Sequence, residues 1–200
     1  MTFTRGFSGR RARDPRLPPG QYDAGRDWPV LTAEATPNLS TDKWTFEIEG
    51  LVEKPVTWTW AEIMALPKSE FMGDIHCVTT WSKLGVRFRG VSVDTLLEAA
   101  QPLPSASYVL ASSTTGYTTN LPLADLLDGQ AWVAFEYGGR PLTAEHGGPA
   151  RLLVPHLYLW KSAKWVQGID LKTKDEPGFW ESLGYHNYGD PWREQRYWGD

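Results

Sequence analysis

The amino-acid sequence predicts an α+β fold of short strands and short helices joined by long loops. Residues 44–52 alternate hydrophobic and polar side chains, which is typical of a half-buried strand. Thr59 and Glu62 have the spacing of a helix capping box, which predicts a short helix over residues 61–66. From residue 176 the chain is rich in aromatic residues and glycine without a regular period, so we expect it to wrap the domain surface or the mouth of a pocket.

The remaining elements are predicted in chain order from the same patterns. Hydrophobic residues at helical spacing predict a helix over residues 91–100, which Pro102 ends, and a helical turn over residues 123–127. Residues 116–122 are predicted as a loop or as a further strand. Runs rich in β-branched and aromatic residues predict strands over residues 71–80 (running into a loop), 108–113, 130–137, 151–155 and 165–171.

The overall composition is that of a globular protein with one domain of fair size. Of its 200 residues, 41% are hydrophobic and 22% are charged. Lysine and arginine number 20 against 24 acidic residues, and the net charge of −4 argues against a general nucleic-acid binder, which needs a basic surface. No hydrophobic run approaches the roughly 18–20 residues of a membrane span. Eleven tryptophans predict a deep core with polar interruptions or a pocket for a flat ligand.

Positive charge is concentrated at the start of the chain. Residues 1–16 contain five arginines against one acidic residue. We therefore predict a flexible basic N-terminal tail over residues 1–27, followed by a single domain over residues 28–200. The Arg10-Arg11 pair is similar to a twin-arginine export signal, but no hydrophobic segment follows it, so we expect a cytoplasmic protein.

Cys77 is the single cysteine of the sequence. One cysteine excludes an internal disulfide, a CxxC redox pair, a CxxCH haem site, an iron–sulfur cluster ligated only by cysteines of this chain, and a zinc ribbon. A lone cysteine is commonly a small buried hydrophobic residue. Here, however, His76 precedes it, and two threonines and a serine follow closely. Such a polar loop also suits a thiolate that acts as a nucleophile or as a ligand of a soft metal.

Two later segments carry cations beside glycine or other small residues. Residues 146–151, His-Gly-Gly-Pro-Ala-Arg, predict a turn that opens a strand, where Arg151 could grip a phosphate or a pterin. Residues 161–164, Lys-Ser-Ala-Lys, follow aromatic residues and could form a cradle for an anion. Taken singly, each segment is more commonly an ordinary solvent-exposed turn.

The order and spacing of these segments resemble the molybdopterin domain of sulfite oxidase-like oxidoreductases. The similarity spans residues 28–195 and is closest to the short, stand-alone bacterial and archaeal branch. It implies a mixed-sheet, sulfite oxidase-type fold and a Mo-molybdopterin cofactor, whose metal is held by one protein cysteine and by the dithiolene of a single molybdopterin. The segments that carry the resemblance are residues 76–83 (HCVTTWSK), 90–91, 146–155, 161–166 and the glycine-aromatic pattern of 178–192.

The resemblance also implies roles for individual residues. Cys77 would bind molybdenum and take part in catalysis, and Tyr185 would be an active-site tyrosine over the metal. His186 would be a neighbouring proton donor or, alternatively, a residue that packs the structure. The cofactor-binding residues would be Ser113 (with Thr114 as the alternative), His146, Arg151, Ser162, Ala163 and Lys164, with further contacts near residues 30–38.

The segment after Cys77 bears on the substrate. Sulfite oxidases have an arginine-bearing run there, whereas this chain has Val78-Thr79-Thr80, which resembles the branch containing the periplasmic methionine sulfoxide reductases. The resemblance therefore implies two-electron oxygen-atom transfer on a small substrate, with a neutral S- or N-oxide favoured over sulfite. The sequence shows no haem or flavin motif, so electrons would come from an external carrier or a redox partner protein. The alternative function is a non-catalytic, Trp-rich module that binds a ligand or pterin.

Arg87 and Arg89 are the nearest arginines after this segment. They flank Phe88, which predicts a strand with both arginines on its solvent face. On this interpretation neither arginine supplies the positive charge that a buried sulfite dianion would require; the alternative is that they fold back into the pocket and supply it.

Overall fold

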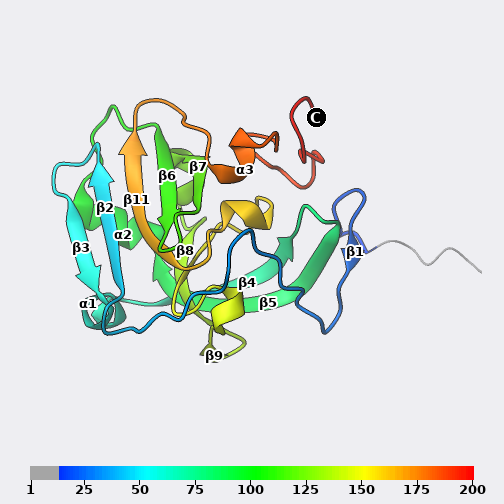
Figure 1. Cartoon of the computed structure of the whole chain (residues 1–200), viewed down its shortest axis with the longest axis horizontal. Coiled ribbons are helices and arrows are strands. Elements are labelled where there is room, and N and C mark those ends of the chain that lie inside the picture. Colours follow the sequence, from blue (N-terminus) through cyan, green and yellow to red (C-terminus); the bar gives the residue numbers. More distant parts are fainter. Residues whose placement is uncertain (1–13) are drawn as a thin grey trace, which may run out of the picture.

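The computed structural model describes residues 14–200, whose strands form two sheets with both parallel and antiparallel pairs (Figure 1). The first sheet has the order β1-β5-β8-β10, with β4 paired to β5 and β9 paired to β8. Its strands are β1 (Tyr22–Asp23), β4 (Ser69–His76), β5 (Trp81–Ser92), β8 (Trp132–Tyr137), β9 (Arg140–Pro141) and β10 (Arg151–Leu153). The second sheet has the order β3-β2-β11-β6-β7. Its strands are β2 (Thr45–Gly50), β3 (Val56–Thr59), β6 (Tyr108–Ser113), β7 (Thr118–Pro122) and β11 (Val166–Lys172).

The helices are short, as predicted. The α-helices are α1 (Trp60–Ala65), α2 (Val93–Ala100) and α3 (Phe179–Ser182), and the 3-10 helices are η1 (Leu123–Leu126), η2 (Ala144–His146) and η3 (Leu159–Lys161). This arrangement of two mixed sheets with a few short helices and long connections confirms the predicted α+β, mixed-sheet fold.

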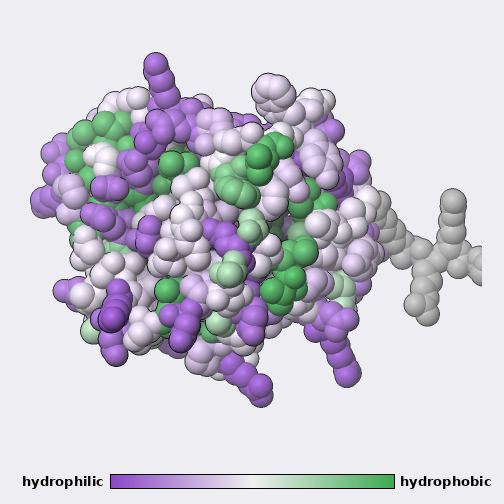
Figure 2. Space-filling view, in the orientation of Figure 1, coloured by the Kyte–Doolittle hydropathy of each residue, from purple (hydrophilic) through white to green (hydrophobic). Residues whose placement is uncertain are grey.

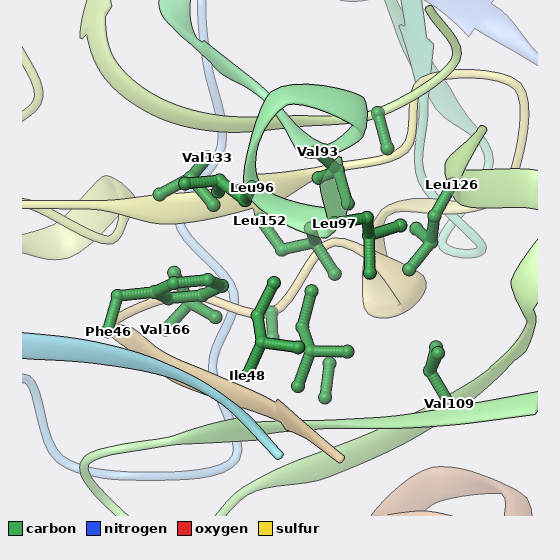
Figure 3. Close-up of a cluster of buried hydrophobic side chains, with 14 of the residues drawn as sticks. Phe46, Ile48, Val93, Leu96, Leu97, Val109, Leu126, Val133, Leu152 and Val166 are labelled. Carbon is green, nitrogen blue, oxygen red and sulfur yellow. The ribbon is translucent and has the colours of Figure 1, made fainter. Parts of the chain in front are cut away.

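The main hydrophobic core joins both sheets and α2 (Figure 3). Phe46 and Ile48 from β2 lie in one cluster with Val133 from β8 and Leu152 from β10, and all four side chains are fully buried. Leu96 of α2 packs into the same cluster. Each strand therefore contributes alternate residues to the shared interior, which explains the alternation visible in the sequence.

The local helix signals are confirmed. Thr59 caps α1: its hydroxyl accepts the Glu62 N–H at 3.4 Å, and the Glu62 carboxylate accepts the Thr59 N–H at 2.8 Å. Ser92 caps α2 by accepting the Asp94 N–H at 3.3 Å. Because β5 continues as far as Ser92, this helix begins two residues later than the prediction of residues 91–100.

The sequence pattern predicts only the part of β5 around Phe88. The whole strand spans Trp81–Ser92, and two glycines and three cations interrupt its alternation. A Cβ atom at Gly90 would overlap the carbonyl oxygen of Val133 on β8, so the strand crossing requires glycine. Arg87 and Arg89 do lie on the solvent face, with Phe88 between them buried, as predicted.

The beginning of the described chain corrects the predicted extent of the N-terminal tail. Residues 14–27 are folded against the domain, and β1 pairs in parallel with β5 through Tyr22 opposite Trp81. Residues 1–13 lie outside the described residues. Composition alone placed the boundary too late, because the contacts that anchor this segment are made with residues far along the chain.

The surface is mixed in polarity. On the face seen in Figure 2, hydrophobic residues lie exposed between hydrophilic ones. Over the whole described surface, the most exposed large hydrophobic side chains are Trp198 at 84% and Met72 at 75%. Within residues 14–200, no helix has the length and hydrophobicity needed to cross a membrane.

Candidate active site

A pocket of about 310 Å³ gathers the segments that the sequence singled out. All the predicted site residues except His186 line it, together with several tryptophans and residues of the N-terminal segment. The predicted residues in the pocket wall are Cys77, Ser113, His146, Arg151, Ser162, Ala163, Lys164 and Tyr185.

Cys77 lies in the tight turn that joins β4 to β5. Its N–H donates to the carbonyl of Trp81 at 2.8 Å, and its own carbonyl accepts the Thr80 N–H at 3.1 Å. Thr80 has φ 74°, the left-handed conformation that closes the turn. The Cys77 sulfur lies 3.1 Å from the Thr79 hydroxyl. Burial raises the pKa of the Cys77 thiol, so binding of a metal here must release its proton.

Arg151 places a buried positive charge at the pocket. The residue is only 2% exposed, and its guanidinium donates to the carbonyls of His146 at 3.1 Å and Ser162 at 2.8 Å. Burial lowers the pKa of Arg151 to about 10. Among the ion pairs of the described residues, none includes Arg151. A buried cation whose hydrogen bonds go to neutral carbonyls favours an anionic ligand.

Lys164 is a second cation in the pocket wall. Its ammonium donates to the carbonyls of Leu31 at 2.8 Å and Glu145 at 2.6 Å. Burial, followed by the charge of Arg151, lowers the pKa of Lys164 to about 8. The two cations thus repel each other in the protein alone, and a bound anion would relieve that repulsion.

Lys161 does not belong to the pocket, so the expectation that two lysines form one anion cradle is wrong. Its side chain is fully buried and pairs with Glu181 at 2.6 Å. It also donates to the carbonyls of Asn120 at 2.8 Å and Asn187 at 2.7 Å. The 3-10 turn of η3 directs Lys161 inward and leaves Lys164 at the pocket.

His146 is held as a neutral imidazole. Burial, and then the charges of Arg151 and Lys164, lower the pKa of His146 to about 4. Its ring stacks on the indole of Trp28, with centroids 3.7 Å apart and planes 7° apart. Trp28 also lines the pocket, and sequence reasoning did not identify it as a site residue. Its only signal is its position just before the predicted contact region of residues 30–38.

Ser113 and Thr114 were alternatives, and the structure distinguishes their positions. Ser113 is buried, lines the pocket and donates its hydroxyl to the carbonyl of Lys164 at 2.5 Å. Thr114 is exposed and is not part of the pocket wall. Ser113 therefore helps to hold the Lys164 backbone at the pocket.

Tyr185 belongs to an aromatic wall on the C-terminal part of the chain. Its ring packs against Trp180 at 4.8 Å and against Trp160 and Tyr197 at 5.4 Å each, measured between ring centroids. Burial is the main cause that raises the pKa of Tyr185, and the charges of Tyr197 and then Cys77 add to it. The phenol therefore keeps its proton and is able to donate a hydrogen bond within the pocket.

His186 is not brought into the pocket with the other predicted residues. Its Nδ1 atom accepts the backbone N–H groups of Tyr188 at 3.0 Å and Gly189 at 3.1 Å. Burial lowers the pKa of His186. This placement supports the packing role considered for His186, since the imidazole organises the loop after Tyr185.

The comparison with protein families identifies the family of this chain. The family described as the oxidoreductase molybdopterin binding domain matches residues 33–180, which include Cys77 and the residues from Ser113 to Lys164 that line the pocket. The chain belongs to this family.

The relatives of this molybdopterin-binding oxidoreductase align with different shares of its sequence and of their own. The uncharacterized oxidoreductase YuiH of Bacillus subtilis is 43% identical over 91% of this chain and 92% of its own length. The putative protein-methionine-sulfoxide reductase subunit YedZ1 of Azospira oryzae is 31% identical, over 72% of this chain and 54% of its own. The protein-methionine-sulfoxide reductase catalytic subunit MsrP of Campylobacter jejuni is 28% identical, over 76% of this chain and 57% of its own length. This chain therefore spans about half the length of the latter two relatives.

A solved structure supports the same fold. The sulfane dehydrogenase SoxCD of Paracoccus pantotrophus superposes with a TM-score of 0.65 at 24% identity, covering 70% of this chain and 41% of that chain. The match to the molybdopterin binding domain and the similarity to the oxidoreductase YuiH confirm the predicted membership in the sulfite oxidase-like family, the predicted enzyme class and the predicted Mo-molybdopterin cofactor.

The donor set of this molybdopterin-binding oxidoreductase fits its cofactor. A cysteine sulfur is a soft ligand suited to molybdenum, and it lies in the pocket wall beside the two cations Arg151 and Lys164. These cations match the anionic phosphate end of a molybdopterin. Trp28 and Trp165 add flat hydrophobic surface to the same wall.

Proposed function

We propose that this enzyme reduces a neutral sulfoxide or N-oxide by two-electron oxygen-atom transfer, in preference to oxidising sulfite. The observation that carries the proposal is the pocket wall: its two cations within the described residues, Arg151 and Lys164, both donate to backbone carbonyls, and both are assigned to the phosphate end of the cofactor. The rest of the wall is mostly uncharged and includes the aromatic side chains of Trp81, Trp160 and Trp180. Such a wall suits an uncharged substrate with a hydrophobic body, because a buried dianion would lose hydration without a matching cation.

The two arginines after Cys77 support this preference. Arg87 pairs with Glu70 at 2.6 Å, and Arg89 pairs with Glu136 at 3.3 Å. Both arginine side chains are about half exposed on the solvent face of β5, and neither lines the pocket. They are therefore not available to bind a sulfite in the pocket.

The named relatives support the same substrate class. YedZ1 and MsrP carry names that refer to protein methionine sulfoxide, which is a neutral S-oxide. On this basis we favour a sulfoxide over an N-oxide as the substrate of the present enzyme.

Each site residue takes a role that follows from its position. Cys77 would hold the molybdenum, and Arg151 and Lys164 would hold the phosphate end of the molybdopterin, with Ser162, Ala163 and Ser113 shaping that end through their backbone and short side chains. When bound, the cofactor supplies the oxygen-atom transfer.

Tyr185 and His146 would have different roles in this arrangement. Tyr185 would donate its phenolic hydrogen to the oxygen of the substrate, which becomes more negative as its bond to sulfur breaks. His146, neutral and stacked on Trp28, would contact the pterin without adding a third positive charge. Reduction of one sulfoxide consumes two electrons and two protons and yields a thioether and water. The electrons would come from an external carrier or partner protein, and a cytoplasmic location completes the proposal.

Steady-state kinetics test the proposal. Enzyme loaded with molybdopterin is assayed with a reduced viologen dye as electron donor and with dimethyl sulfoxide, free methionine sulfoxide and trimethylamine N-oxide as substrates. Sulfite oxidation is assayed in parallel with an artificial acceptor. We expect kcat/KM for at least one neutral oxide to exceed that for sulfite at least about tenfold, the equivalent of about 1.4 kcal/mol. A higher kcat/KM for sulfite overturns the proposal.

A further inference from the structure

The segment of residues 21–34, here named the strap, connects the parts of the site that lie far apart in the sequence. In Figure 1 it is the dark blue chain that leaves β1 and crosses the molecule toward β2. Residues 28–34 contribute to the pocket wall at almost every position, ending at Glu34. Because the strap touches both the Cys77 turn and the cofactor pocket, its path affects both.

The first part of the strap is bonded to the Cys77 turn. The Gln21 side-chain amide donates to the carbonyl of Cys77 at 3.1 Å, and its oxygen accepts the Ser82 hydroxyl at 3.2 Å. The N–H groups of Tyr22 and Ala24 donate to the carbonyls of Thr80 at 2.9 Å and Ser82 at 2.8 Å. The strap is thus a third strand beside the turn that carries the metal-binding sulfur.

Lys83 fixes the next part of the strap. Its ammonium donates to three consecutive carbonyls, those of Gly25 at 3.0 Å, Arg26 at 3.2 Å and Asp27 at 3.0 Å. Lys83 is only 7% exposed. An ammonium has three hydrogens, and here each has a carbonyl partner, so the backbone of the strap curls around the Lys83 head group. A hydrophobic residue of the same length would fill the space without imposing this curl.

The curl leads directly to the pocket. Trp28 follows Asp27 and stacks on His146. Three residues further, the carbonyl of Leu31 accepts the Lys164 ammonium at 2.8 Å. The curl at residues 25–27 thus lies along the chain between the Cys77 turn contacts and these two pocket contacts.

We propose that Lys83 is a positioning residue for the cofactor site, acting through the strap to hold the Cys77 turn and the pocket wall formed by residues 28–34. The inference rests on the proposed role of Cys77 and its pocket in holding the molybdopterin. Lys83 does not line the pocket, so its effect on the cofactor is transmitted by the strap.

Hydrogen exchange of the cofactor-free protein tests the first half of the proposal. In Lys83→Met, the amides of Tyr22, Ala24 and Cys77 should exchange about tenfold faster or more, because the bonds of a charged donor are lost, while core amides of β11 keep their rates. Lys68→Met is the matched control, since Lys68 also donates to a backbone carbonyl, but to that of Met64, four residues earlier in its own segment, and not to the strap. It should leave strap exchange at the wild-type rate.

Cofactor retention tests the second half. The rate at which molybdopterin is lost from the loaded protein, followed by fluorescence of the released pterin, should rise about tenfold in Lys83→Met and remain unchanged in Lys68→Met. Ala24→Pro is a second variant that removes one strap hydrogen bond and leaves the Lys83 side chain in place, so it should produce both effects at smaller size even if Lys83→Met folds poorly.

Two outcomes overturn the inference. One is wild-type exchange of the strap amides in Lys83→Met and Ala24→Pro. The other is faster strap exchange without faster loss of molybdopterin. Neither measurement uses a substrate, so an enzyme that proves to prefer sulfite would refute the proposed function and leave these results unaffected.

Discussion

The indole of Trp28 and the imidazole of His146 lie in parallel planes, with centroids 3.7 Å apart. Replacing Trp28 with alanine should expose His146 and raise its pKa from about 4 toward its ordinary value, because burial is the main cause of the low value. The pKa is measured by NMR titration of the histidine ring protons in the cofactor-free protein. Trp28→Phe keeps an aromatic face and should shift the pKa less. An unchanged His146 pKa in Trp28→Ala would contradict the account of the stack.

The low pKa of His146 also predicts how stability depends on pH. The unfolded protein binds a proton on this side chain below about pH 6.5, whereas the folded protein does so only near pH 4. Above pH 6.5 the side chain is neutral in both states, so the free energy of unfolding is at its full value. It decreases as the pH falls from 6.5 toward 4, because the proton then binds preferentially to the unfolded protein. We expect His146 to account for about 1–2 kcal/mol of that loss, less than the full shift implies because the ring is only half-buried. Urea unfolding at several pH values gives the free energy of unfolding as a function of pH. Between pH 6.5 and 4 this free energy should fall less steeply in His146→Gln than in the wild type, and an identical pH dependence would refute the assignment.

Cys77→Ser should give a folded protein with little or no activity. A serine hydroxyl is a harder ligand than a thiolate and keeps its proton near neutral pH, so it does not replace sulfur at molybdenum. The isosteric change leaves the backbone bonds of the turn to Trp81 and Thr80 in place. Circular dichroism checks the fold, and electron paramagnetic resonance should show a changed molybdenum signal. Unchanged turnover in a metal-replete sample would exclude Cys77 as the ligand.

Arg151→Ala should lower the molybdopterin content of the purified protein. Loss of a buried charge-assisted bond to the cofactor costs about 2–5 kcal/mol of binding. Arg151→Lys should also reduce the content, because a lysine cannot donate at once to both carbonyls, those of His146 and Ser162, and to a ligand in the same planar geometry. Pterin released by denaturation is measured per folded protein. Equal content in wild type and Arg151→Ala would refute the cofactor role.

Tyr185→Phe should lower kcat for a sulfoxide about 10–100-fold with a small change in KM, because the lost hydrogen bond is strongest in the transition state. The ring contacts with Trp180 and Trp160 need no hydroxyl, so the aromatic wall should persist. Tyr197→Phe is the matched control on the same wall and should leave kcat near the wild-type value. Equal kcat values in the wild type and Tyr185→Phe would remove Tyr185 from the mechanism.

Local sequence signals predicted the elements whose interactions are local. The capping box of Thr59 and Glu62 closes within one helical turn, and its residues alone are sufficient to position the start of α1. The alternation in residues 44–52 predicted β2 because one face of that strand is buried in the core. The site segments were predictable only together: Cys77 and the turn before Arg151 are ambiguous when taken singly, and it is their order and spacing along the chain that resemble the family.

Contacts between distant segments decided the rest. The sequence near Lys161 and Lys164 offers two similar cations, and only the packing of Glu181 against η3 buries the first and leaves the second at the pocket. Likewise, nothing local to Lys83 shows that it holds the carbonyls of residues 25–27. The amino-acid sequence by itself determined the family, the fold class and the site motifs, because these depend on residue types and on the order of motifs along the chain. The tertiary structure alone decided that the N-terminal segment folds into the site, because a buried ammonium satisfies its hydrogen bonds with whichever carbonyls the folded chain brings to it.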